Sequence, residues 1–156
     1  MDCDRNGMVE KAGRARLAVL IDAENASPRH ARAVFEVLGG LGEVTVRRIY
    51  GDFSHGRLAS WNAAIRTFAI VPWHQPAHAR GKNAADIALA VDAMDLMHGH
   101  GLDGIALMSS DSDFTRLAQR LREGGLAVYG FGESKAPQAF RAACHRFETL
   151  GKGWNR

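Results

Sequence analysis

The chain has 156 residues, of which 46% are hydrophobic and 24% charged, a composition typical of one folded domain with a sizeable core. It contains no apolar run of transmembrane length and no stretch near Met1 that resembles a signal peptide, so we expect a cytoplasmic protein that makes no membrane contact. The net charge of +3 is too small for a protein that coats nucleic acid constitutively, although it permits an anionic partner.

We expect one domain over residues 16–150, between a loose N-terminal tail at residues 1–15 and a C-terminal tail at residues 151–156. Apolar or β-branched runs predict five strands, at residues 17–21, 43–50, 69–73, 104–108 and 126–131, with residues 146–150 as a candidate last strand. Helical spacing of apolar residues predicts helices between them, at residues 28–38, 57–67, 84–98, 114–123 and 138–144.

Two of these helices contain further local signals. Gly39-Gly40 is expected to end the first helix, and Ile87, Val91 and Met94 are spaced to form the buried stripe of the third. Because strands alternate with helices, we expect a three-layer α/β/α fold with a mainly parallel central sheet of about five strands. In the common doubly wound arrangement the first strand is central, the fourth lies beside it, and ligands bind between them.

Carboxylates follow the two strands that this arrangement places side by side. Asp22 ends the first strand, and Asp111 and Asp113 follow the fourth after two serines. Each acid alone also has an ordinary explanation as a turn or helix-cap residue. Together at one sheet edge they would repel, by about 4 kcal/mol for a pair about 4 Å apart at an effective dielectric constant near 20. A divalent cation would relieve this repulsion, and oxygen ligands suit Mg²⁺ or Mn²⁺.

The loop and helix after the third strand supply further candidates. Asp86, in the first turn of the helix, is expected to form the third side of the acidic pocket, whereas Asp92 is turned away from it. Arg80 and Lys82 flank the pocket and are candidates for holding phosphates, with a solvated charged loop as an equal alternative. Further candidates for substrate binding are Asn83 and Ser110. Glu24 is expected to face outward.

Four motifs in this order resemble the NYN family, in its LabA-like branch of the PIN-like nuclease domains. They are Ile-Asp-Ala-Glu-Asn at residues 21–25, Gly-Lys-Asn-Ala-Ala-Asp-Ile-Ala-Leu-Ala-Val-Asp at 81–92, Ser-Ser-Asp-Ser-Asp-Phe at 109–114 and Val-Tyr-Gly-Phe-Gly at 128–132. The resemblance implies a PIN-like fold and metal-dependent ribonuclease activity. It implies that Asp22, Asp86, Asp111 and Asp113 hold the metal and that Asn25 is their polar partner.

The leading expectation is therefore a ribonuclease that uses Mg²⁺ or Mn²⁺ to hydrolyse RNA phosphodiester bonds, with no organic cofactor. One alternative is a catalytically weak RNA-binding or interaction module of the same fold. Another is a phosphatase of the haloacid dehalogenase type, which needs an aspartate two residues after its nucleophile, where this chain has Glu24. A homodimer is an option that the sequence leaves open.

Overall fold

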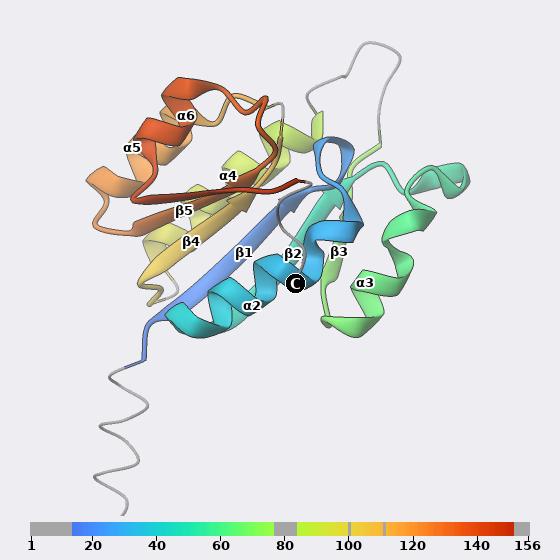
Figure 1. Ribbon diagram of the computed structural model, residues 1–156, viewed down its shortest axis with the longest axis horizontal. Coiled ribbons are helices and arrows are strands. Elements are labelled where there is room, and N and C mark those ends of the chain that lie inside the picture. Colours follow the sequence, from blue (N-terminus) through green and yellow to red (C-terminus); the bar gives the residue numbers. More distant parts are fainter. Residues whose placement is uncertain (1–13, 77–83, 100, 111, 152–156) are drawn as a thin grey trace, which may run out of the picture.

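The computed structural model describes residues 14–76, 84–99, 101–110 and 112–151. Six parallel strands form one sheet in the order β3-β2-β1-β4-β5-β6 (Figure 1). The strands are β1 (Arg16–Asp22), β2 (Glu43–Gly51), β3 (Val71–His74), β4 (Gly104–Met108), β5 (Ala127–Gly132) and β6 (Arg146–Thr149). The candidate last strand is confirmed, because β6 pairs with β5 along its length.

Helices cover both faces of this sheet, which gives the three layers expected from the sequence (Figure 1). The α-helices of the described residues are α2 (Ala31–Leu41), α3 (Asn62–Thr67), α4 (Ala84–Gly99), α5 (Thr115–Glu123) and α6 (Gln138–Ala143). In β1, Leu17, Val19 and Ile21 pack with α2 and α3 on one face, whereas Ala18 and Leu20 pack with α4, α5 and α6 on the other. No helix in the described ranges is long and apolar enough to cross a lipid bilayer.

The centre of the sheet has the geometry that binds ligands in open α/β folds. β1 lies beside β4, with Ile21 opposite Met108. The chain leaves β1 for α2 on one face and leaves β4 for α5 on the other, so the strand order reverses between these two strands. Such a reversal opens a crevice at the carboxyl ends of the strands. The predicted adjacency of the first and fourth strands is therefore confirmed.

Two helix boundaries differ from those expected. The first helix does not end at Gly39-Gly40 but continues to Leu41, because Leu38 is fully buried and Leu41 packs against the same core. The expected helix at 57–67 is shorter: two 3₁₀ helices, η3 (Ser54–Gly56) and η4 (Ala59–Trp61), precede α3. His55 has a φ of 56° within this stretch, which interrupts regular helical structure.

The predicted buried stripe of α4 is wrong. Ile87 is 63% exposed and Val91 is 61% exposed, while Met94 is partly buried. The buried stripe consists instead of Ala85, Leu89, Ala93 and Leu96. This helix has apolar residues on all sides, and its alanines allow it to lie close to the sheet, so tertiary packing decided which stripe is buried.

Candidate functional site

Asp22 is the most deeply buried acid of the described residues at the carboxyl edge of the sheet, with 1% of its surface exposed. Its Oδ2 accepts hydrogen bonds from Ser112 Oγ at 2.7 Å, Ser109 Oγ at 3.0 Å and Asn25 Nδ2 at 3.1 Å. Its Oδ1 is also buried but has no hydrogen-bond partner within the described part of the chain. Because buried polar atoms are almost always paired, this oxygen is a candidate atom for binding a ligand.

Local structure explains how these donors reach Asp22. The parallel register between β1 and β4 brings Ser109 to the level of Asp22. The 3₁₀ helix η1 (Ala23–Asn25) turns the chain immediately after β1, so that Asn25 reaches back to Asp22 three residues earlier. The backbone N–H of Ser110 then donates to the Asn25 carbonyl at 2.7 Å. This bond joins the loop after β1 to the loop after β4.

Asp86 comes to the same place from the first turn of α4. The Ser112 hydroxyl lies between the two carboxylates, 2.7 Å from Asp22 Oδ2 and 3.1 Å from Asp86 Oδ2. A hydroxyl has one proton, so Ser112 can donate to only one carboxylate at a time.

The pKa of Asp86 reflects this crowding. Its pKa is raised to about 7, mainly by burial and then by the charge of Asp22, a hydrogen bond with Asp22 and the charge of Glu24, while the bond from Ser112 opposes the shift. Ionising two adjacent carboxylates together is energetically unfavourable unless a positive charge lies beside them. The pair formed by Asp22 and Asp86, which we call the acid pair, is therefore suited to a cation.

The predicted metal-binding acids do not all lie at the acid pair in the described part of the chain. Asp22, Asp86 and Asn25 lie together as expected, and Asp111 lies outside the described residues. Asp113 is exposed, and its Oδ1 accepts bonds from the hydroxyl and the backbone N–H of Thr115, which lower its pKa. Across the described ranges no three His, Cys, Asp or Glu side chains form a metal-binding group, so Asp113 does not join the acid pair.

The predicted substrate-binding residues are only partly described. Arg80, Lys82 and Asn83 lie outside the described residues. Ser110 is 6% exposed, and its Oγ accepts the backbone N–H of Glu133 at 3.1 Å.

Sequence reasoning missed two serines at this site. Ser109 and Ser112 both donate to Asp22, from positions 87 and 90 residues away along the chain. The available signal was the concentration of hydroxyls around Asp111 at the end of an apolar strand.

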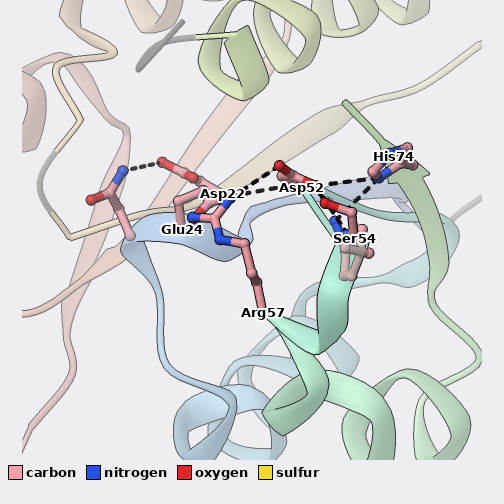
Figure 2. A network of polar contacts seen from close by, with 8 residues as sticks. Asp22, Glu24, Asp52, Ser54, Arg57 and His74 are labelled. Atoms are coloured by element: carbon pink, nitrogen blue, oxygen red, sulfur yellow. Dashed lines mark hydrogen bonds and ion pairs between the residues drawn. The ribbon is translucent and has the colours of Figure 1, made fainter. Parts of the chain in front are cut away.

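A second pair of acids, Asp52 and Glu24, lies nearby, and an arginine side chain pairs with both of them. Arg57 bridges Asp52, at 3.0 Å, and Glu24, at 3.4 Å (Figure 2). Glu24 Oε2 also accepts the Asp52 backbone N–H at 3.1 Å. The sequence predicts that Glu24 faces outward, but its side chain is only 28% exposed and is held at the edge of the site by these contacts. Arg57 neutralises part of the charge of these two acids, whereas the acid pair has no such counter-ion in the described part of the chain.

Comparison with known proteins identifies a family and a shared fold. A family model described as the NYN domain matches residues 16–151. An uncharacterized protein of Methanocaldococcus jannaschii is 26% identical over 128 residues, which cover 79% of this chain and 50% of that protein. The chain therefore spans about half the length of that curated relative. The crystal structure of a protein of unknown function from Vibrio parahaemolyticus is similar, with a TM-score of 0.71 at 19% identity over 88% of this chain and 94% of the other. This likeness shows a shared fold.

Proposed function

Because the chain belongs to the NYN domain family, whose PIN-like domains are generally nucleases, we propose that it is a metal-dependent ribonuclease of the LabA-like branch. RNA is the proposed partner and the cytoplasm the proposed location. The proposal is supported chiefly by the buried Asp22 Oδ1, which has no partner among the described residues, beside the Asp86 carboxyl group, whose pKa is raised to about 7.

The residues of the acid pair fit a hard divalent cation. Asp22 and Asp86 would hold Mg²⁺ or Mn²⁺ through carboxylate oxygens, with Asp111 as the predicted third ligand. We leave Asp113 out of this set, because its carboxylate binds the first turn of α5. When bound, the cation supplies stabilisation of negative charge on phosphoryl oxygens and activation of a water molecule.

The chain itself contributes position and charge. Ser109, Ser112 and Asn25 fix the Asp22 carboxylate through Oδ2, which leaves Oδ1 to bind the cation. Hydrolysis adds water across the P–O bond and releases one oxygen as an alcohol, so the reaction requires no protein nucleophile. Cys144 is unsuited to that role in any case, because burial raises the pKa of its thiol to about 11.

The first test compares two Asp→Asn substitutions with the same change in charge. We expect Asp22→Asn to reduce RNA cleavage to background in Mg²⁺ or Mn²⁺, because it removes a metal-binding oxygen. Asp95→Asn changes an exposed residue of α4 and is expected to leave cleavage unchanged. Cleavage of a labelled RNA oligonucleotide by the purified proteins is the measurement.

The same preparations separate the alternatives. Metal-dependent cleavage that persists in Asp22→Asn would refute the proposed site. RNA binding in chelator, without product after long incubation with Mn²⁺, would favour the RNA-binding module. Release of phosphate from small phosphomonoesters, without RNA cleavage, would favour the phosphatase.

A further inference from the structure

A cavity of about 180 Å³ lies beside the acid pair, at the carboxyl ends of β1, β4 and β5. Its polar lining consists of Glu24, Asn25, Ser27, Ser110, Glu133 and Lys135. A cavity needs only about 10–15 Å³ of such volume to hold one ordered water, so this space can hold more than one water. The cavity also lies where the strand order reverses, the usual ligand position in open α/β sheets. We call it the β1–β5 pocket.

Asn25 connects the pocket to the acid pair. Its amide N–H₂ donates to Asp22 at 3.1 Å and lies 3.2 Å from Ser112 Oγ. The carbonyl Oδ1 is therefore the atom of this side chain that remains for a ligand in the pocket. A nucleotide whose phosphate sits at the acid pair would thus place its neighbouring sugar within reach of the pocket.

The chemistry of the lining favours a ligand rich in hydroxyl groups. Glu24 and Glu133 carry carboxylates and Asn25 a carbonyl, all of which accept hydrogen bonds. The two carboxylates would repel a phosphate, although Lys135 at the same pocket offers one positive charge. A ribose is uncharged and brings hydroxyl donors, so it satisfies this lining better than a phosphate does.

Glu133 is one of the two carboxylates of this lining, and basic side chains lie beside it. Its Oε2 lies 3.2 Å from Nε2 of His30, which is only 6% exposed, and 3.6 Å from the Arg29 guanidinium. Its backbone N–H donates to Ser110 Oγ. Within the described residues these side-chain contacts use Oε2, which leaves Oε1 to accept a bond from a ligand.

We propose that the β1–β5 pocket binds the ribose next to the cleaved phosphate and that Glu133 accepts a hydrogen bond from its 2′-hydroxyl. This inference rests on the proposed nuclease function. It makes the pocket the part of the site that distinguishes RNA from DNA, because the 2′-hydroxyl is absent from DNA. A hydrogen bond to a charged acceptor predicts a preference for RNA of roughly 10- to 100-fold.

The test uses oligonucleotides of one sequence made of ribose, of deoxyribose, or of deoxyribose with a single ribonucleotide at each position in turn. The measurements are kcat/KM for cleavage in Mn²⁺ and binding by fluorescence anisotropy in EDTA. Glu133→Gln removes the charged acceptor, whereas Ser27→Leu fills the pocket and leaves Glu133 in place. Glu123→Gln is the matched control, because it makes the same charge change at an exposed residue ending α5.

We expect the wild-type protein and Glu123→Gln to prefer RNA, and one ribonucleotide beside the cleaved bond to restore most of this preference. Glu133→Gln should lower the RNA/DNA ratio about tenfold or more through slower RNA cleavage, because it weakens only the bond to the 2′-hydroxyl. Ser27→Leu excludes the sugar itself, so it should slow cleavage of both polymers, RNA by the larger factor, and lower the ratio in the same direction. Thermal unfolding shows which variants are folded, and Ser27→Leu decides the result if Glu133→Gln is not.

The outcomes also separate the pocket from the nuclease function. If cleavage is metal-dependent but the folded pocket variants keep the wild-type RNA/DNA ratio, the pocket proposal is refuted and the nuclease stands. If the protein cleaves neither polymer, the nuclease proposal fails and binding in EDTA decides the pocket. No preference for RNA by the wild-type protein in either measurement refutes the pocket proposal.

Discussion

Asp22 and Asp86 show how two identical side chains acquire different roles from their surroundings. Asp22 has one oxygen saturated by three donors and a second oxygen without a partner in the described residues. Asp86 shares the single Ser112 hydroxyl with Asp22, and its pKa is raised to about 7 by burial and by the neighbouring Asp22 carboxylate. Without a cation, Asp86 therefore takes up a proton near neutral pH.

This difference predicts a pH-dependent stability. The pKa of Asp86 rises from 3.8 to about 7 on folding, so the folded state binds more protons than the unfolded state between these values. The free energy of unfolding should therefore decrease as the pH rises from about 4 to about 7. In metal-free buffer we expect Tm to fall between pH 5 and pH 8, and Asp86→Asn to flatten that fall.

Circular dichroism melting curves over this pH range provide the measurement. Asp95→Asn, which changes an exposed acid on the same helix, should keep the wild-type slope. An unchanged slope in Asp86→Asn would show that other groups cause the pH dependence.

At the scale of elements, α4 determines where Asp86 lies. Tyr50 of β2 donates its hydroxyl to Asp92 Oδ2 at 2.7 Å, and Arg48 pairs with the same oxygen at 3.4 Å. Tyr50 is also the residue opposite Asp22 in the register between β1 and β2. Asp92, which the sequence places away from Asp86, thus anchors the helix to the strand next to Asp22 and restricts the position of Asp86.

From the observed orientation of α4 we expect the stability cost of substitutions on this helix to be opposite to that expected from its sequence. Leu89 is fully buried, so Leu89→Ala should lower the free energy of unfolding by about 2–5 kcal/mol. Ile87 is 63% exposed, so Ile87→Ala should change it by less than about 0.5 kcal/mol. Urea unfolding of both variants measures the difference, and a larger cost for Ile87→Ala would indicate that this face of α4 is covered in solution.

At the scale of the whole molecule, three segments far apart in the sequence form one site at the crevice between β1 and β4. The end of β1 and the 3₁₀ helix after it supply Asp22 and Asn25, the start of α4 supplies Asp86, and the loop after β4 supplies Ser109 and Ser112. A cation bound there would contact only the folded chain, because the unfolded chain separates these residues. Metal binding should therefore stabilise the fold.

The expected stabilisation is measurable. At a Mn²⁺ concentration 100 times the Kd, a ligand of the folded state contributes about 2.7 kcal/mol. For a chain of this length that corresponds to a rise in Tm of roughly 5–10 °C at pH 7.5. Asp86→Asn should abolish most of the rise and Asp95→Asn should keep it, as measured by differential scanning fluorimetry with and without EDTA. An equal rise in all three proteins would place the metal elsewhere.

The sequence by itself determined those strands and helices whose pattern of apolar residues is compatible with only one structure. The run before Asp22 and the run before Ser109 are continuously apolar, and both are fully buried strands in the centre of the sheet. Continuous apolar runs suit strands covered on both faces, and their alternation with helices implied a parallel sheet. The meeting of Asp22 and Asp86 followed from that topology, because parallel strands end at the same edge.

Only the tertiary structure decided the features that depend on which surfaces meet. Apolar residues surround α4, so its sequence permits more than one buried face, and contact with β1 and β2 selected the one with Leu89. The serines that bind Asp22, and the contact of Glu133 with His30, join residues about 90 to 103 positions apart. A pattern in a short stretch of sequence reflects the conformational preferences of residues that are neighbours along the chain. Contacts of this kind depend instead on packing between distant segments, which the folded chain alone establishes.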